Sequence, residues 1–269
     1  MLGVMEDMLQ SREYMAQALE LARKGAGWVD PNPLVGAVVV RDGEVLATGY
    51  HDRYRGPHAE RMAFDYADAN GIDLTGATVI DTLEPCCHVG SQPACTDLIL
   101  AHGIARVVVG SVDPNPIVAG KGLRILEEAG VEVVRDVMRE ECDAINRHFF
   151  YYITTGKPYI VDGRRRVGES ASEYAARRRE LYATYAAVLA GTESDVPDES
   201  FAHFNGPVQA VGADEVVIGG HRPLLLEAGA LACTDPDEWL SELGKRKIDS
   251  LIVESDEAFE RLSMACQKD

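Results

Sequence analysis

A histidine, a glutamate and two cysteines stand at spacings that suit a metal-dependent hydrolase. Glu60 follows His58 by two positions, and Pro85-Cys86 is separated from Cys95 by eight residues. One imidazole and two thiolates are the ligands that tetrahedral Zn²⁺ takes when its fourth position is left open for water. A carboxylate close to the histidine is placed to move protons on that water. The sequence therefore predicts a catalytic zinc site in which Glu60 carries the proton.

Each of these residues has an ordinary structural explanation when it is taken alone. A lone cysteine is usually a small core residue, and a lone histidine is usually a satisfied polar residue. Their order, however, is typical of zinc-dependent nucleobase deaminases, whose signature is H-x-E followed by P-C-x-x-C. This chain has the wider spacing P-C-x8-C. The combination favours a zinc site over four unrelated structural residues.

The composition excludes several classes of protein. The 269 residues are 46% hydrophobic and carry a formal net charge of −18. Nucleic-acid-binding proteins need a basic face, and no apolar run approaches the ~20 residues of a membrane span. The first residues do not form a secretory leader. We therefore expect a cytoplasmic enzyme with no nucleic-acid or membrane partner.

The cysteines do not indicate a disulfide framework. Three of the six cluster at positions 86, 87 and 95, and the others are scattered at 142, 233 and 266. In a chain of this length without a secretory leader, such a cluster is more typical of metal binding.

Strand and helix signals alternate through the first half of the chain. Asp42-Gly43 lies between the apolar runs 36–40 and 45–50, which predicts a β-hairpin. Further strands are expected near 78–82, 106–110 and 131–134, separated by helices near 59–70, 96–102 and 122–129. A first helix is expected to begin at an N-cap on Ser11 and to end near Gly25. This order predicts an α/β fold with three layers, α/β/α.

The motifs fall at the ends of these elements. His58 and Glu60 begin one helix, Cys86 follows a strand, and Cys95 precedes the next helix. Two helix N-termini are therefore expected to meet at the metal site. Their positive ends favour the thiolate forms of the cysteines.

Residues 11 to about 158 resemble the deaminase domain of the bifunctional riboflavin-biosynthesis deaminase/reductase family. The matching segments are Pro31-Asn32-Pro33-Leu34-Val35-Gly36, Gly49-Tyr50-His51, Pro57-His58-Ala59-Glu60, Thr82-Leu83-Glu84-Pro85-Cys86, Cys95, Asp113-Pro114-Asn115-Pro116, Ala119-Gly120-Lys121-Gly122-Leu123 and Thr155-Gly156-Lys157-Pro158-Tyr159. The resemblance implies a cytidine-deaminase-like fold. It also implies a zinc hydrolase that deaminates 2,5-diamino-6-ribosylamino-4(3H)-pyrimidinone 5′-phosphate, a small pyrimidine nucleotide.

The resemblance also implies a role for each matching residue. His58, Cys86 and Cys95 bind Zn²⁺, and Glu60 is the catalytic proton shuttle. Five further residues match positions that line the substrate site: Asn32, His51, His88, Asp113 and Asn115. Ordinary explanations remain open for some of them, since Asn32 between two prolines suits a turn and the two histidines could order their loops.

Two departures from the family pattern leave alternatives open. Cys87 stands where the family usually has Ser or Asn, and Ser91 stands where it usually has Lys or Arg. A basic residue there suits a phosphate-bearing substrate. One alternative is therefore a zinc deaminase for another nucleobase or nucleotide. A second alternative is a non-catalytic zinc scaffold, although a purely structural site has no use for Glu60.

We expect two domains: a zinc-dependent deaminase in residues 1–155 and a smaller, degenerate reductase-like α/β domain in residues 156–269. The family's Glu-Gly-Gly is replaced by Glu254-Ser255-Asp256, and glycines are what let a backbone approach a phosphate. We therefore expect no dinucleotide cofactor. The arginine runs at 164–166 and 177–179 are expected to be solvated or salt-bridged. The segment 191–207 is expected to be a loop, and the chain a homo-oligomer.

Overall fold

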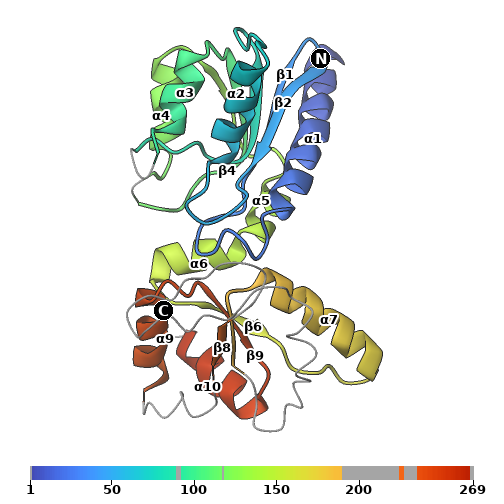
Figure 1. Cartoon of the computed structure of the whole chain (residues 1–269), viewed down its shortest axis with the longest axis vertical. Coiled ribbons are helices and arrows are strands. Elements are labelled where there is room, and N and C mark those ends of the chain that lie inside the picture. The colour runs from blue at the N-terminus through green and yellow to red at the C-terminus, as the bar shows by residue number, and fades with distance from the viewer. Residues whose placement is uncertain (1, 89–91, 117, 190–223, 227–234, 267–269) are drawn as a thin grey trace. The chain divides into compact units, whose positions relative to one another are not determined.

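The computed structural model describes residues 2–88, 92–116, 118–189, 224–226 and 235–266. The chain divides into two compact units. Unit 1 contains residues 1–25 and 33–150, and unit 2 contains residues 26–32 and 151–269. The division near residue 150 falls inside helix α6 (Arg147–Thr155), at whose end the sequence placed the boundary. Each unit has its own sheet, as Figure 1 shows.

Unit 1 is built on a five-stranded sheet in the order β2-β1-β3-β4-β5. Its strands are β1 (Gly36–Arg41), β2 (Glu44–Tyr50), β3 (Thr78–Leu83), β4 (Arg106–Ser111) and β5 (Glu132–Val134). β1 is antiparallel to β2 and β3, whereas β3, β4 and β5 are parallel. The predicted hairpin is confirmed. Asp42 and Gly43 turn the chain with φ values of 53° and 83°.

Helices cover both faces of this sheet (Figure 1). They are α1 (Leu2–Arg23), α2 (Ala59–Ala69), α3 (Cys95–Ala101), α4 (Lys121–Glu128) and α5 (Arg139–Ile145). On one face, Phe64 of α2, Ile99 of α3 and Leu126 of α4 pack on alternate strand residues such as Val79. On the other face, residues of α1 and α5 pack on the intervening strand residues such as Ile80. The predicted three-layer α/β/α arrangement is confirmed.

One predicted boundary is wrong. Ser11 does not cap the first helix, because α1 begins at Leu2 and Ser11 lies within it with 7% of its surface exposed. The ten residues before Ser11 include three Met and two Leu, which favour helix and extend it towards the N-terminus. The other helices and strands predicted for unit 1 agree with the structure within one or two residues.

Unit 2 contains a four-stranded sheet whose pairings are all parallel, in the order β6-β9-β7-β8. Its strands are β6 (Tyr159–Asp162), β7 (Ala187–Leu189), β8 (Leu224–Leu226) and β9 (Ser250–Val253), and its helices include α7 (Ala171–Thr184), α9 (Pro236–Lys245) and α10 (Asp256–Cys266). α7 begins with a capping box between Ser170 and Glu173, a strong start signal for a helix. Leu240, Leu251 and Leu262 are buried in the core of this unit.

Both arginine runs contribute to ion pairs, as predicted. Arg164 pairs with Asp162, and Arg177 pairs with Glu169, both with Nε–O distances of 2.8 Å. Arg178 is more buried than expected for a solvated arginine, because 12% of its side chain is exposed. It pairs with Glu254, whose side chain is 1% exposed. The predicted loop at 191–207 lies outside the described residues.

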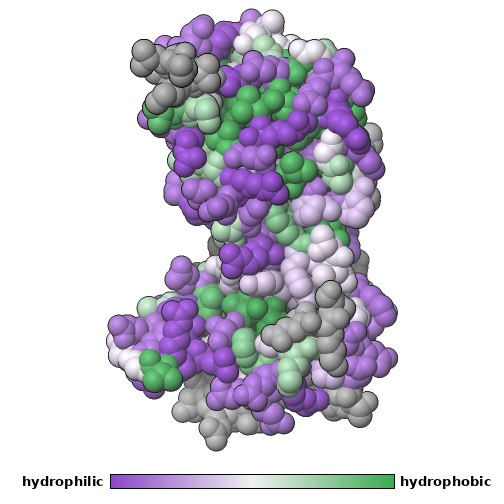
Figure 2. All heavy atoms as spheres, turned by 180° about the vertical axis from the view of Figure 1, so that it is seen from behind, coloured by the Kyte–Doolittle hydropathy of each residue, from purple (hydrophilic) through white to green (hydrophobic). Residues whose placement is uncertain are grey.

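The visible surface carries both hydrophilic and apolar side chains. Figure 2 shows hydrophilic side chains spread over the visible face of each unit, with apolar side chains gathered in patches between them. Among the described residues, no helix combines the length and the apolar composition needed to span a membrane.

Candidate deaminase site

The candidate site lies where α2, the end of β3 and the start of α3 meet. His58 occupies the N-cap position of α2 in an extended conformation, and Glu60 lies in the first turn. Cys86 follows β3 by three residues, and Cys95 is the first residue of α3. α2 can approach the sheet because Gly49 lies beneath it, where a Cβ atom would be 2.1 Å from the carbonyl oxygen of Ala59.

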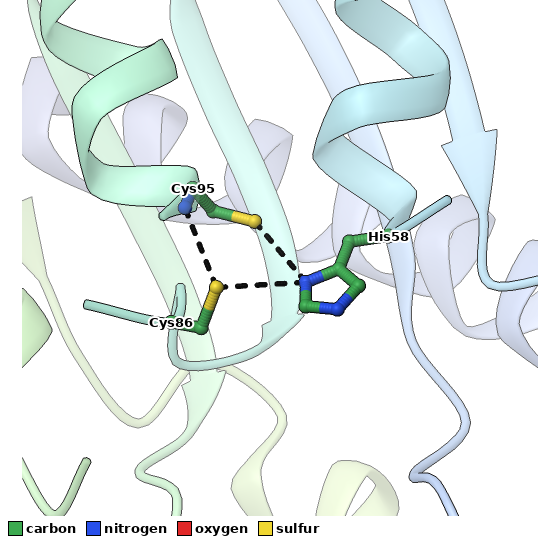
Figure 3. A group of neighbouring side chains, drawn as sticks. All are labelled: His58, Cys86 and Cys95. Atoms are coloured by element: carbon green, nitrogen blue, oxygen red, sulfur yellow. Dashed lines mark hydrogen bonds between the residues drawn. The ribbon is translucent and has the colours of Figure 1, made fainter. Parts of the chain in front are cut away.

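The three predicted metal ligands converge on one point (Figure 3). The Nδ1 atom of His58 lies 3.5 Å from the Sγ atom of Cys86 and 3.4 Å from that of Cys95. The backbone N–H of Cys95 donates to the Cys86 sulfur at 3.3 Å. All three ligand atoms lie within 4.8 Å of one another.

This spacing fits a tetrahedral zinc ion. With Zn–N of about 2.1 Å and Zn–S of about 2.3 Å, tetrahedral coordination holds a nitrogen and a sulfur ligand roughly 3.6 Å apart. The two N–S distances in the structure, 3.5 and 3.4 Å, are close to that value. One imidazole and two thiol sulfurs are also a donor set that zinc prefers. The residues present therefore fit the metal.

The charges at the site favour a metal-binding thiolate. Hydrogen bonds from Cys95, together with the hydrogen bond to His58, lower the pKa of the Cys86 thiol to about 4. The same contact with Cys86 raises the pKa of the His58 imidazole. The pKa of Cys95 is raised well above its usual range, first because its thiol donates to the Cys86 sulfur. A divalent cation would balance the negative charge that these groups place in a mostly buried site.

Glu60 lies buried beside these ligands, with 3% of its surface exposed. Burial raises the pKa of its carboxyl group, and the nearby negative charge of Cys86 adds to the effect. A carboxyl group whose pKa is raised holds a proton more readily than an exposed one, which suits a group that must both accept and release a proton. The arrangement can therefore supply a metal-activated water with a proton carrier at its side.

Three of the five predicted substrate residues lie near the metal ligands. The ring of His51 meets that of His58 edge-on, with centroids 5.8 Å apart, and its Nδ1 atom lies 2.8 Å from the Pro57 oxygen. His88 is exposed two residues beyond Cys86. Asp113 is buried, and burial raises the pKa of its carboxyl group to about 6. An electrostatic interaction with His88 lowers the pKa of Asp113 and so partly offsets the effect of burial, which shows that these two residues are neighbours.

The remaining predicted residues are placed as follows. Asn115 lies in the same turn as Asp113 and donates its backbone N–H to the Asp113 carboxylate at 2.8 Å. Asn32 clusters with unit 2, and its backbone N–H donates to Val29. Its role at the site stays a prediction. Ser91 lies outside the described residues.

Two buried acids at the site were not assigned a role from the sequence. Glu84 accepts hydrogen bonds from four backbone N–H groups, those of Asp113, Gly120, Gly122 and Leu123. Its place directly before Pro-Cys was a signal that could have been used. Asp81 is fully buried on β3, and its two carboxyl oxygens have no hydrogen-bond partner among the described residues. Burial raises its pKa well above the usual range, and Glu60 adds to this.

Comparison with known proteins gives the family of this site. A model of the cytidine and deoxycytidylate deaminase zinc-binding region matches residues 8–111. The riboflavin biosynthesis protein RibD of Actinobacillus pleuropneumoniae is 36% identical over 293 aligned residues, covering 90% of this chain and 77% of that protein. RibD of Escherichia coli is 43% identical, but the match covers 62% of this chain and 46% of that protein.

Solved structures extend the likeness beyond the first unit. The deaminase/reductase of Thermotoga maritima, described as a diaminohydroxyphosphoribosylaminopyrimidine deaminase and 5-amino-6-(5-phosphoribosylamino)uracil reductase, superposes with a TM-score of 0.78 at 31% identity. That match covers 96% of this chain and 84% of the other. Acinetobacter baumannii RibD gives a TM-score of 0.67 at 27% identity. The chain therefore belongs to the RibD family of riboflavin-biosynthesis proteins, and it is an α/β enzyme of the deaminase class.

Proposed function

We propose that this chain deaminates 2,5-diamino-6-ribosylamino-4(3H)-pyrimidinone 5′-phosphate, with His58, Cys86 and Cys95 as zinc ligands and Glu60 as the catalytic acid–base. The observation that carries the proposal is the buried Glu60 carboxyl group beside three convergent ligand atoms. A purely structural zinc site has no need of a buried acid at this place. The family and its Thermotoga maritima relative support the substrate.

The residues of the chain divide the reaction between them. Zinc, when bound, supplies a Lewis acid that makes water acidic near neutral pH. Glu60 accepts the proton of the attacking water and passes it to the ring nitrogen next to the amino-bearing carbon. It then takes the second proton from the hydroxyl group now on that carbon and delivers it to the amino group. The amino group leaves as ammonia while the ring gains a carbonyl oxygen. His51, His88, Asp113 and Asn115 are proposed to hold the substrate, as is Asn32.

The decisive experiment separates catalysis from metal binding. Glu60→Gln keeps the size of the side chain and removes its proton-carrying group. Ammonia release from the pyrimidine phosphate should fall by roughly two orders of magnitude or more, while zinc content stays at the wild-type value. Asp65→Asn, an exposed position on the same helix, is the matched control and should keep full activity. Near-normal turnover in the Glu60 variant would exclude the proposed role.

A second candidate substrate class is favoured by one residue. Ser91 replaces the basic residue that the family usually carries between the two cysteines, so the protein could prefer an unphosphorylated base or nucleoside. Ser91→Lys should tighten binding of the phosphate ester if that ester is the natural substrate. Comparing apparent affinities for phosphorylated and dephosphorylated substrate in both proteins distinguishes the two classes.

We also propose that residues 156–269 form a reductase-like domain without a working dinucleotide site. The absence of glycines after Glu254 supports this, as does the ion pair that occupies its carboxylate. The proposed partners are a small pyrimidine nucleotide and, in a cytoplasmic homo-oligomer, further copies of the chain. The strongly acidic composition speaks against nucleic acid as a partner.

A further inference from the structure

Glu84 is a buried carboxylate that binds two segments of unit 1 together. With 4% of its surface exposed, its Oε2 atom accepts the N–H groups of Asp113 at 3.2 Å and Gly120 at 2.8 Å. Its Oε1 atom accepts those of Gly122 at 3.0 Å and Leu123 at 3.4 Å. A buried carboxylate needs such partners, and hydrogen bonds to a charged acceptor are stronger than neutral ones.

The partners of Glu84 belong to the turn that carries two of the proposed substrate residues. Its donors come from the beginning and the end of residues 113–123, which we call the substrate turn. Asp113 and Asn115 lie within it, linked by their own hydrogen bond. Glu84 therefore holds both ends of the substrate turn at once.

Glu84 itself belongs to residues 84–86, which end at the proposed ligand Cys86 and which we call the metal-ligand segment. Glu84 precedes the ligand Cys86 by two residues, and its own backbone N–H donates to the oxygen of Ser111 at the end of β4. The first turn of α4 also lies directly against this segment, because a Cβ atom on Gly122 would be 2.3 Å from the oxygen of Pro85. The substrate turn is thus fixed against the backbone that leads to the metal ligand.

We propose that Glu84 is a positioning residue for deamination: its carboxylate sets the distance between the substrate turn and the metal-ligand segment. This inference rests on the proposed function for the role of Asp113 and Asn115. Glu84 itself touches backbone groups of the protein, so its effect on substrate passes through the turn. A substrate carbonyl or amino group placed by Asp113 would meet the reacting centre at the geometry that Glu84 maintains.

The test is Glu84→Gln, with Glu128→Gln at an exposed position of α4 as the matched control. The amide replaces one of the two acceptor oxygens by an NH₂ group, so two backbone N–H groups lose their acceptor. We expect KM for the pyrimidine phosphate to rise about tenfold or more, with a smaller change in kcat and with zinc content unchanged. Amide hydrogen exchange across residues 113–123 should accelerate by a similar factor.

A double-mutant cycle separates positioning from general stabilisation. If Glu84 acts through the substrate turn, Glu84→Gln should add little to the KM defect of Asp113→Asn, because residues that act through one another are not additive. Fully additive KM effects would overturn the proposal. So would a folded Glu84→Gln protein with wild-type KM, or one whose whole loss of activity follows its loss of zinc.

Two further measurements keep the test informative. If Glu84→Gln does not yield folded protein, Gly120→Ala strains one donor of the same contact, since Gly120 has a φ of +77° and open space around its Cβ position. Gly120→Ala should also raise KM for the pyrimidine phosphate, and an unchanged KM would contradict the proposal. If the wild-type protein does not deaminate the pyrimidine phosphate, the proposed function fails, whereas unchanged exchange in residues 113–123 of the Glu84 variant would refute the positioning role.

Discussion

The neighbouring thiols of Cys86 and Cys87 differ in what surrounds them. The Cys86 sulfur is held by Cys95 and His58, and its pKa is lowered to about 4. Burial and the charge of Glu84 raise the pKa of the Cys87 thiol instead. The ligand atoms of His58, Cys86 and Cys95 lie within 4.8 Å of one another, and among the described residues Cys87 does not belong to this group. The structure therefore favours Cys86 over Cys87 as the ligand.

This difference gives a prediction at the scale of single residues. Cys95→Ala removes one of three ligands and should cause a large loss of zinc, measured by metal analysis of the purified protein. Cys87→Ala is the matched control and should keep about one zinc per chain. Full zinc occupancy in the Cys95 variant would contradict the proposed ligand set.

The sequence was sufficient to predict which side chains come together at the candidate site but insufficient to predict which residues hold them in place. His58, Glu60, Cys86 and Cys95 carry distinctive chemistry at short spacings, and a family signature connects them. The role of Glu84 depends on backbone N–H groups that lie up to 39 positions away in the sequence, and no side-chain pattern records such groups. Asp81 is hidden for a similar reason, because its burial follows from the order of the strands on either side of it.

At the scale of elements, a buried ion pair joins α7 to Glu254, the residue that follows β9. Arg178 of α7 makes two hydrogen bonds to Glu254, at 2.8 and 3.1 Å, and it also donates to the hydroxyl of Tyr182. That hydroxyl in turn donates to Glu254. Removing one partner of such a pair leaves the other charge buried without compensation.

Glu254→Gln should therefore destabilise unit 2 by about 3 kcal/mol. Both tryptophans of the chain, Trp28 and Trp239, belong to unit 2, so urea unfolding followed by tryptophan fluorescence reports on this unit. Glu242→Gln is the control, because Glu242 is half exposed in its pairs with Lys245 and Arg246 and should change stability by less than about 1 kcal/mol. Equal effects of the two substitutions would contradict the interpretation.

Element positions were predicted well where the local pattern is strong. The Asp42-Gly43 hairpin and the apolar run of β4 are local signals, and the structure confirms both. The beginning of α1 was missed because a serine within a helix looks like a cap unless the residues before it are weighed as helix formers. The strand order β6-β9-β7-β8 could not be predicted, since it depends on long-range pairing.

At the scale of the whole molecule, we predict that the full chain does not bind NADPH productively. A dinucleotide phosphate needs close backbone N–H groups and a favourable field. The segment after β9 offers Ser255 and the acidic Asp256 in place of glycines, and Asp256 pairs with Arg164. We expect no NADPH oxidation with the deaminated product and no cofactor-dependent rise in melting temperature. Micromolar binding measured by calorimetry would restore a bifunctional enzyme.

The three convergent side chains come from distant points of the chain, and this separation has a mechanical consequence. His58 stands 28 positions from Cys86 and 37 from Cys95, so an ion bound to all three closes long loops in the manner of a cross-link. Closing such loops carries an entropic cost that the bound ion offsets. Chelation should therefore loosen the start of α2 and of α3 first, visible as faster amide exchange there, while exchange in β6 and β9 stays as it was. The bound ion would then stabilise the contact between the starts of α2 and α3 as well as take part in the reaction.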